Sequence, residues 1–382
     1  MSFPIEQFIK KAQEQNKSEK FIQTCLSYIK KLSEKELPVI FSLEHLAILI
    51  GVQSDFLRVL IGDSKNGFTV DEYENEYKYK RYNYFKLKKR DGKFREIMSP
   101  AKDLKYIQKW ILVNILSKYL LADSCKGFRK DISIYDNAKV HEHSTIILKV
   151  DLLKFYDTIT EKRVYGLFRS LGYVNNLAYS FAKITTARHR ESYWDDFDQN
   201  SKSILGQLVE NKPAILPQGA PTSPMISNIL ATKMDYRFEA LARKLNCNYS
   251  RYADDLTFSI SIHGKLPSLK LINKIISEEG FFINNRKTRY MKRGCKQYVT
   301  GLTTTNGINI SKEYRKGIAE HIYYCRKFGV AEHLERRKAE FPKYNNIRFH
   351  DWLYGHMCFI KSINEKASKK MLEDFNKINW YV

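Results

Sequence analysis

Apolar residues recur every three or four positions along the first part of the chain, which is the spacing of amphipathic helices. This pattern runs through residues 5–36 and returns at residues 43–61, where Gly51 separates two short apolar stretches. We predict helices in both segments, with a turn at Gly51. The second segment has the spacing of a helix-turn-helix DNA reader, but a plain packed pair of helices explains it better. Residues 63–80 are polar and charged and are predicted to form a loop.

The pattern changes to alternation in residues 82–100, which indicates a β-hairpin. Residues 84–89 alternate like a strand, an Asp-Gly turn signal follows, and residues 94–98 provide the returning strand. This hairpin carries many Lys and Arg side chains. We predict a basic helix after it, at residues 104–112.

Two predicted strand regions lead to carboxylates. The apolar stretch at residues 145–150 ends in Asp151, and roughly a hundred residues later Asp254 and Asp255 lie between two β-prone stretches. The second pattern predicts a hairpin with both carboxylates at its tip. Asp is common in turns, but two like charges held together are unfavourable without a cation between them. The pattern therefore indicates a cation site built by two strand regions.

The segment between these strands is predicted to be mainly helix and loop. Residues 158–161 fit a capping box that opens a helix, and Gly172 is placed to close it. Residues 194–213 are polar. They contain three aspartates, Asp195, Asp196 and Asp198. These carboxylates are a second candidate for metal binding by number alone, but no strand pattern flanks them, so we predict a solvated loop.

Three prolines and a glycine fill residues 216–224, which predicts a fixed, irregular loop. Gly219 would let the backbone approach a ligand closely. The loop opens a predicted helix at residues 222–245, whose N-terminus favours phosphate or a template backbone. Residues 311–382 are predicted to be mostly helical and basic. The order of strand, helix, helix and hairpin predicts an α+β fold, with helices on one face of an antiparallel sheet.

Composition and charge narrow the class of partner. The 382 residues suffice for two or three subdomains, and 65 Lys and Arg against 42 Asp and Glu give a net charge of +23. Such an excess favours a polyanion, with nucleic acid as the leading candidate. No apolar run approaches the roughly 20 residues that span a bilayer, and the first residues lack a signal-peptide pattern. We therefore expect a cytoplasmic protein with no membrane partner, and six cysteines without a CxxC pair favour reduced thiols over a zinc site.

The paired carboxylates match the needs of one reaction class. In-line nucleotidyl transfer uses two divalent cations about 3.5–4 Å apart. Mg²⁺ prefers carboxylate oxygens and keeps several waters. We predict that Asp151 and Asp254 are catalytic metal ligands and that Asp255 is an auxiliary one.

Three segments, in this order and at this spacing, resemble motifs A, B and C of reverse transcriptases. They are Asp151 with Tyr156 five positions later, the Gln218–Pro224 loop, and the tetrad Tyr252-Ala253-Asp254-Asp255. The hairpin at residues 85–100 resembles the fingers of this family, and residues 280–288 resemble its motif D. The resemblance spans roughly residues 80–312, most of the chain.

Two short segments are similar to signatures of the retron branch of this family. Asn137 to His141 matches the NAxxH signature, and Val299-Thr300-Gly301 matches the VTG signature. The chain also departs from the branch. Lys126 stands where His is usual, Asp131 stands where small residues are common, and Asp157 is an extra carboxylate with no assigned role.

The resemblance implies a right-hand polymerase of α+β class with an antiparallel palm sheet. The implied parts are an N-terminal helical extension at 1–75, fingers at 76–144, a palm at 145–300 that includes fingers elements at about 172–215, and a helical, RNA-binding thumb at 301–382.

It also implies roles for individual residues. Two Mg²⁺ ions, with Mn²⁺ able to substitute, would be bound by Asp151, Asp254, Asp255 and the Leu152 carbonyl. Tyr156 would be a steric gate that excludes the ribose 2′-hydroxyl, the alternative being a core aromatic. The incoming nucleotide would be contacted by Arg95, Lys86 or Lys88, Tyr156, Gln218, Gly219 and Lys287. RNA would be contacted by Asn137, His141, Val299, Thr300 and Gly301.

The implied function is RNA-directed DNA synthesis from dNTPs on a cognate, structured non-coding RNA. The product would be branched multicopy single-stranded DNA, and the retron would act in anti-phage defence with an effector protein encoded nearby. Two alternatives stay open: another bacterial reverse transcriptase, of group II intron-like or other defence-associated type, and a non-catalytic RNA-binding protein.

Overall fold

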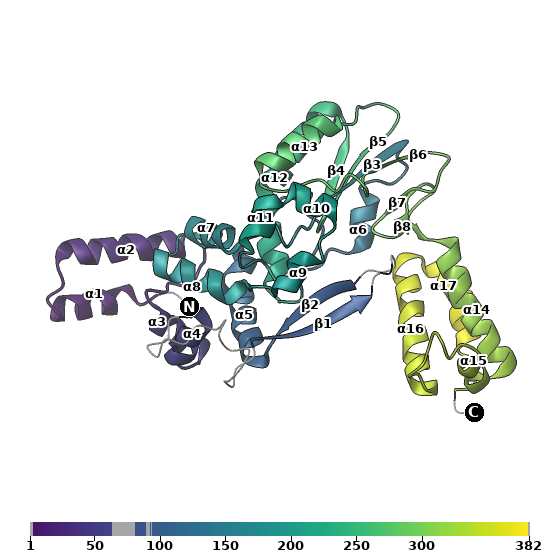
Figure 1. Cartoon of the computed structure of the whole chain (residues 1–382), viewed down its shortest axis with the longest axis horizontal. Helices are drawn as coiled ribbons and strands as arrows, with labels where there is room; N and C mark the ends of the chain where they lie inside the picture. The colour runs from purple at the N-terminus through teal and green to yellow at the C-terminus, as the bar shows by residue number, and fades with distance from the viewer. Residues whose placement is uncertain (1–2, 63–80, 89–91, 93, 381–382) are drawn as a thin grey trace. The chain divides into compact units, whose positions relative to one another are not determined.

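The protein is described by a computed structural model, which covers residues 3–62, 81–88, 92 and 94–380 (Figure 1). The chain divides into two compact units, and it passes between them several times. Unit 1 comprises Met1–Phe128, Asp151–Arg237 and Leu269–Asn284, and unit 2 comprises Arg129–Val150, Phe238–Ser268 and Asn285–Val382.

The N-terminal part of unit 1 is helical, as the apolar spacing predicts. Its helices are α1 (Ile5–Glu14), α2 (Glu19–Ser33), α3 (Leu43–Ile50) and α4 (Ser54–Ile61). Gly51 ends α3 with a φ of 79°, a left-handed conformation that glycine adopts without steric cost. The predicted loop at residues 63–80 lies outside the described residues.

The predicted basic hairpin is present in unit 1. Strands β1 (Tyr82–Lys88) and β2 (Phe94–Pro100) pair in antiparallel register, with Lys86 opposite Glu96. Most of the turn that joins them lies outside the described residues. The helix expected after the hairpin is α5 (Lys102–Asn114), followed by the short 3₁₀ helix η2 (Leu116–Lys118).

The next helices of unit 1 are α7 (Glu161–Leu171) and α8 (Asn175–Thr185), and Gly172 ends α7 as predicted. The predicted capping box is wrong. The N-cap is Thr160, which makes no capping hydrogen bond through its side chain. The Thr158 hydroxyl instead donates to the carbonyl of Phe155 at 2.9 Å, within the turn that precedes the helix.

The predicted solvated loop at 194–213 is also wrong, because the segment forms three short helices. They are α9 (Glu191–Asp195), α10 (Gln199–Ile204) and α11 (Gly206–Asn211). Trp194 and Phe197 are buried in a cluster with Leu153 and Ile215. Asp198 caps α10 by accepting a hydrogen bond from the Ser201 amide at 2.9 Å. Helices of five or six residues are too short to show a clear helical period in the sequence.

Two longer helices complete this part of the chain, α12 (Ser223–Leu245) and α13 (Leu269–Glu278). The predicted helix at 222–245 is confirmed. Residues 223–237 of α12 belong to unit 1 and the remainder belongs to unit 2.

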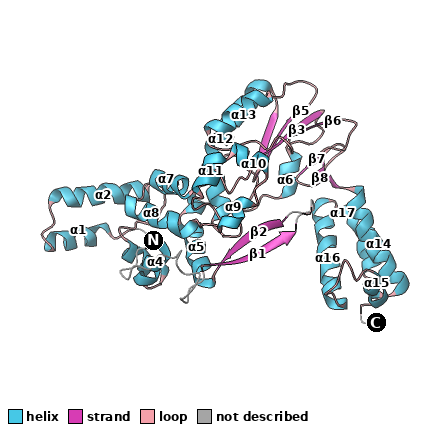
Figure 2. Ribbon diagram, in the orientation of Figure 1, coloured by secondary structure: helices cyan, strands magenta, loops and turns pink. Residues whose placement is uncertain are grey.

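Unit 2 is built on an antiparallel sheet with the strand order β4-β5-β3-β6 (Figure 2). The strands are β3 (Ile146–Asp151), β4 (Asn248–Tyr252), β5 (Asp255–Ile260) and β6 (Arg289–Lys292). β3 is buried almost throughout, as its apolar run predicts, and the C-terminal part of α12 packs on the hairpin through Phe238, Tyr249 and Phe258. The sheet and its helices confirm the predicted α+β class.

A smaller sheet, the short helix α6 and four C-terminal helices form the rest of the described part of unit 2. The smaller sheet contains β7 (Tyr298–Val299), β8 (Leu302–Thr303) and β9 (Asn309–Ile310), and α6 (Ile134–Lys139) contacts it. The C-terminal helices are α14 (Lys312–Phe328), α15 (Val330–Arg336), α16 (Asn346–Ile363) and α17 (Glu365–Phe375), which confirms the helical prediction for this region. Among the described residues, no helix has the length and apolar character required to cross a membrane. The predicted boundaries at 75, 144 and 300 stay predictions.

Candidate active site

Asp254 lies in the two-residue turn between β4 and β5. The strands pair up to Tyr252 and Asp255, so the predicted hairpin is confirmed, but Asp255 is the first residue of β5 and not part of the turn. Ala253 has a φ of 57°, an uncommon conformation for a residue with a side chain. The fully buried Arg251 guanidinium donates to the Ala253 carbonyl at 3.1 Å. A buried cation therefore supports the strained turn that carries Asp254.

Asp255 is engaged by a cation of the protein. Its Oδ2 accepts a hydrogen bond from Nζ of the buried Lys149 at 3.0 Å. Lys149 lies on β3, the strand next to β5 in the sheet, two positions before Asp151. The positive charge of Lys149 offsets the negative charge of Asp255. A metal role for this carboxylate stays a prediction.

Asp151 is the last residue of β3 and is 7% exposed. Nδ2 of Asn284 donates to its Oδ1 at 3.1 Å, and the Asn284 backbone amide donates to its carbonyl oxygen at 2.8 Å. The amide of Leu153 donates to the Phe282 carbonyl at 2.7 Å, so the chain that follows Asp151 runs beside residues 282–284. The motif D resemblance covered this segment, but only the fold identifies Asn284 as the partner of Asp151.

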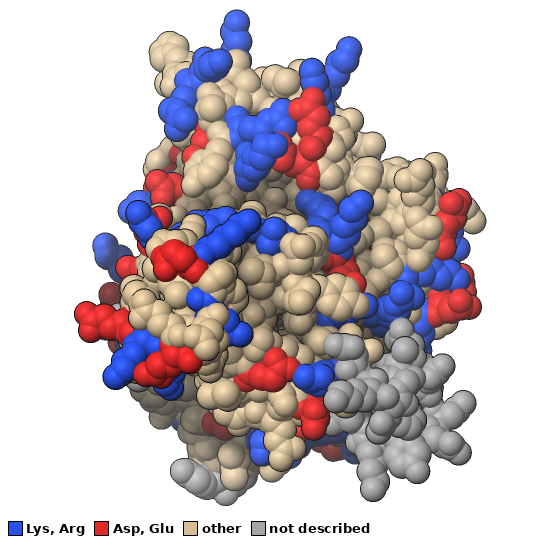
Figure 3. Space-filling view, turned by 90° about the vertical axis from the view of Figure 1, so that its left-hand side faces the viewer, with Lys and Arg blue, Asp and Glu red and all other residues tan. Residues whose placement is uncertain are grey.

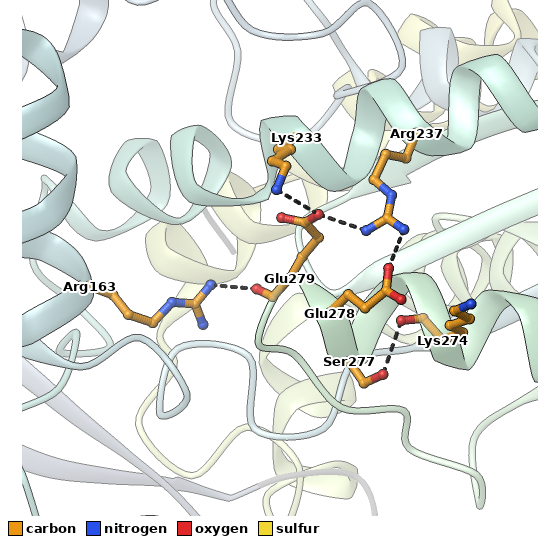
Figure 4. A network of polar contacts seen from close by, with 7 residues as sticks. All are labelled: Arg163, Lys233, Arg237, Lys274, Ser277, Glu278 and Glu279. Atoms are coloured by element: carbon orange, nitrogen blue, oxygen red, sulfur yellow. Dashed lines mark hydrogen bonds and ion pairs between the residues drawn. The ribbon is translucent and has the colours of Figure 1, made fainter.

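A polar network holds the segment that leads to Asn284 (Figure 4). The Arg163 guanidinium donates to the carbonyls of Glu279, Gly280 and Thr158, at 2.9, 2.8 and 3.1 Å, and lies 4.3 Å from the Phe281 ring centre. Burial lowers the pKa of Arg163 to about 10, which leaves it charged at neutral pH. Arg163 therefore ties the turn after Asp151 to the segment before Asn284.

The same network reaches α12. Arg237 donates to Oε1 of Glu279 at 2.8 Å and also pairs with Glu278, and Nζ of Lys233 lies 3.3 Å from Glu279 Oε1 (Figure 4). The hydrogen bond from Arg237 is the main cause that lowers the pKa of Glu278. Residues of α7 and α12 are thus linked to the C-terminal end of α13 through Glu278 and Glu279.

Tyr156 lies in a tight turn after Asp151. Lys154 has a φ of 49°, the Thr158 amide donates to the Lys154 carbonyl at 3.0 Å, and the Ile159 amide donates to the Tyr156 carbonyl at 3.1 Å. The Tyr156 ring is partly buried, with its centre 5.7 Å from that of Phe155. The turn fixes the backbone that carries the predicted gate.

The Gln218–Gly219 loop lies directly against strand β2. The Met98 amide donates to the Gln218 carbonyl at 2.8 Å. A Cβ on Gly219 would lie 2.8 Å from the Met98 carbonyl oxygen, and Gly219 has a φ of 123°. The glycine is therefore required for the loop to contact the hairpin. The close approach of its backbone to a ligand stays a prediction.

The predicted triphosphate-binding cations are exposed. Arg95 on β2, Lys86 and Lys88 on β1, and Lys287 before β6 are all exposed, and Lys86 is the cross-strand partner of Glu96. Their nucleotide contacts stay predictions.

Asn137 and His141 of the NAxxH signature belong to a buried network and do not face solvent. Nδ1 of His141 lies 2.8 Å from Oγ of Ser259, and Nε2 lies 2.8 Å from Oγ of Ser250. The Ser250 hydroxyl donates to Oδ1 of Asn137 at 2.7 Å, so it must accept from Nε2–H of His141. Asn137 is 1% exposed and His141 is fully buried. The protein itself binds the polar atoms of both side chains, and their predicted RNA contacts stay predictions.

The VTG residues belong to the same region. Val299 is fully buried in the core of unit 2, and its predicted RNA contact also stays a prediction. Thr300 and Gly301 form the turn between β7 and β8, and the Thr300 hydroxyl donates to the Ile134 carbonyl at 3.1 Å. Gly301 is exposed and Thr300 is partly exposed, so RNA contacts at these two positions stay a prediction.

Burial lowers the pKa of His141 to about 3, with the charge of Lys149 as a second cause. His141 is therefore neutral at physiological pH. It links β4 to β5 through Ser250 on β4 and Ser259 on β5, the strands that flank the turn carrying Asp254. The NAxxH segment supports the hairpin from inside the protein.

The donor set at the candidate site fits hard divalent cations. Asp151 and Asp254 offer carboxylate oxygens, and Mg²⁺ typically binds one or two carboxylates together with substrate phosphates. Within the described part of the chain, no group of three or more His, Cys, Asp or Glu side chains forms a metal cluster.

Comparison with known proteins now identifies the class. The family model for reverse transcriptase (RNA-dependent DNA polymerase) matches residues 87–303, more than half of the chain. The chain belongs to the reverse transcriptase family, whose members are RNA-directed DNA polymerases that generally use divalent metal ions. This assignment confirms the predicted right-hand polymerase class and an RNA template as partner.

The relatives specify the branch. The retron Ec86 reverse transcriptase of Escherichia coli is 28% identical over 91% of this chain and 92% of that protein. The retron Mx65 reverse transcriptase of Myxococcus xanthus is 30% identical over 89% of this chain and 73% of that protein. The retron Mx162 reverse transcriptase of Myxococcus xanthus is 36% identical over 56% of this chain, and that match spans 45% of its length. The predicted resemblance to retron reverse transcriptases is confirmed.

Proposed function

We propose that this retron reverse transcriptase copies a cognate, structured non-coding RNA into branched multicopy single-stranded DNA. The substrates are dNTPs, and the ions are two Mg²⁺, with Mn²⁺ able to substitute. One observation carries the catalytic part of this proposal. Asp151 ends strand β3, Asp254 lies in the turn that opens β5, and β5 neighbours β3 in the sheet.

Asp151 and Asp254 are the proposed ligands of both ions, with the Leu152 carbonyl and Asp255 in supporting roles. The ions, when bound, activate the attacking hydroxyl and stabilise charge on the triphosphate and leaving group. Asn284 orients the Asp151 carboxylate, and the turn supported by Arg251 presents Asp254.

The remaining predicted residues select and hold the nucleotide. Arg95, with Lys86 or Lys88, binds the triphosphate, since a guanidinium suits phosphate oxygens. Tyr156 excludes the ribose 2′-hydroxyl, Gln218 and Gly219 contact the incoming nucleotide and template, and Lys287 lies near the leaving pyrophosphate. The exposure of Arg95, Lys86, Lys88 and Lys287 supports these roles.

The RNA part of the proposal rests on charge and on the retron relatives. The net charge of +23 favours phosphate binding, and on the face shown in Figure 3 the Lys and Arg side chains lie in several groups with Asp and Glu among them. A 2′-hydroxyl of an internal guanosine in the RNA primes synthesis. The retron acts in anti-phage defence with an effector protein encoded nearby.

Substitution of Asp254 tests the catalytic proposal. We expect Asp254→Asn to abolish dNTP incorporation on a primed RNA template, because an amide does not replace the charge of a metal-binding carboxylate, while RNA binding survives. The matched control is Asp196→Asn, at an exposed carboxylate in unit 1. Equal incorporation by Asp254→Asn and the control would exclude the metal role.

The retron product has its own test. Nucleic acid that copurifies with the enzyme, expressed together with its flanking locus, is sequenced with and without debranching treatment. DNA joined to a small RNA through a 2′ linkage supports the proposal, whereas linear DNA only would indicate another type of bacterial reverse transcriptase.

A further inference from the structure

Asp157 is a buried carboxylate next to the predicted gate Tyr156, and the family resemblance gives it no role. It is 1% exposed, and burial raises its pKa. A carboxylate in such a place is costly unless polar partners compensate for lost water. Its surroundings therefore show what the residue does.

The partner of Asp157 is a tyrosine from α9. The Tyr193 hydroxyl donates to Oδ1 of Asp157 at 2.9 Å. Oδ2 of Asp157 accepts no hydrogen bond from the described residues but lies 3.7 Å from Nζ of Lys154. Nζ of Lys154 in turn lies 3.5 Å from the ring centre of Phe197. The carboxylate is thus held from both sides by the turn of Tyr156 and by the α9 region.

Tyr193 connects this carboxylate to the hairpin. The ring of His189 stacks on the ring of Tyr193, with 3.9 Å between their centres and 25° between their planes. Nδ1 of His189 lies 3.1 Å from Oε1 of Glu96 on β2. The hydrogen bond with His189 is the main cause that lowers the pKa of Glu96. Glu96 directly follows Arg95, the predicted triphosphate ligand.

We infer that Glu96, His189, Tyr193 and Asp157 form a gate relay, a set of positioning residues that fixes Tyr156 relative to strand β2. This inference rests on the proposed function, in which Tyr156 is the gate and Arg95 binds the triphosphate. A nucleotide whose triphosphate is bound by Arg95 on β2 places its ribose near the Tyr156 ring. The relay fixes the distance between that ring and β2. The relay therefore controls discrimination against ribonucleotides without touching the nucleotide.

The location of the relay supports this role. All four residues belong to unit 1, and Tyr193 packs against a buried cluster that includes Leu153, Trp194, Phe197 and Ile215. Charged hydrogen bonds in a dry environment are strong and directional. The relay thus forms a rigid connection between two elements that are far apart in the sequence.

Removal of one hydroxyl tests the relay. Tyr193→Phe deletes the donor to Asp157 and keeps the ring that stacks on His189. We expect the ratio of ribonucleotide to deoxynucleotide kcat/KM to rise about three- to tenfold, because a loosened gate admits the 2′-hydroxyl. Tyr165→Phe is the matched control, since its hydroxyl, 3.4 Å from Oδ1 of Asn175, lies elsewhere in unit 1. Single-nucleotide incorporation on a primed RNA template is the measurement.

A double variant distinguishes a positioning role from a general structural one. If Tyr193 acts through the gate, adding Tyr193→Phe to Tyr156→Ala changes selectivity no further. Unchanged selectivity in Tyr193→Phe, or additive effects in the double variant, would overturn the relay. In that case a selectivity change in Tyr156→Ala still supports the proposed function, whereas loss of selectivity effects in all three variants places the gate elsewhere.

Discussion

Asp151 and Asp254 are presented by different means. The Asp151 carboxylate is oriented by Asn284, which lies 133 positions further along the chain. Asp254 lies on a hairpin turn whose supports, Arg251 and the His141 network, act on the hairpin itself. The hydrogen bond from Asn284 acts on the Asp151 carboxylate itself, whereas the supports of Asp254 act on the turn and strands that carry it. The two carboxylates are therefore presented in different ways, one through contacts to its side chain and the other through support of its backbone.

The largest expected difference between the two supports follows from removing the buried cation, Arg251. We expect Arg251→Met to reduce the free energy of unfolding by about 3 kcal/mol, because the Ala253 carbonyl loses a charged, fully buried donor. Urea unfolding of the full chain measures this change. Arg243→Met removes an exposed arginine at the end of α12 and should change stability little. Equal destabilisation by both variants would contradict a specific support for the turn.

Loss of the amide at Asn284 should affect function more than stability. We expect Asn284→Ala to raise the Mg²⁺ concentration for half-maximal incorporation by about tenfold, since Asp151 loses the hydrogen bond that orients it. Mn²⁺ binding followed by electron paramagnetic resonance gives a readout independent of activity. Asn285→Ala, at the exposed neighbouring residue, is the control. An unchanged metal requirement would contradict an orienting role for the Asn284 side chain.

A separate prediction concerns the pH dependence of the His141 network. The pKa of His141 is lowered from 6.5 to about 3 on folding, so the unfolded chain binds more protons between these values. The stability that neutral His141 provides is present above pH 6.5 and is lost as the pH falls toward 3, by at most about 1.4 kcal/mol per pH unit.

His141→Gln removes this titration. The difference in urea midpoint between pH 7 and pH 5 should therefore be smaller in His141→Gln than in the original chain. Both proteins keep His321 and His333, whose pKa values burial lowers to about 4, so their contribution cancels. The same pH sensitivity in both proteins would show that His141 is not neutral in the fold.

The local patterns predicted the elements that carry Asp151 and Asp254. Strand β3, the β4–β5 hairpin and α12 follow from apolar runs and turn residues. Three features could not be predicted from such patterns. The helices α9 to α11 are too short for a period, Asn284 meets Asp151 only through the fold, and the burial of Arg251 depends on tertiary packing. The signature Asn137–His141 is visible in the sequence. That its Asn and His side chains are buried follows only from the fold.

Gly219 restricts how this enzyme can be altered. Its backbone touches the Met98 carbonyl so closely that even a methyl group would push strand β2 away, and that strand also carries Arg95. Swapping the loop with one from another polymerase would succeed only if the hairpin were exchanged with it. The two segments, separated by more than a hundred positions, must therefore be redesigned as a single module.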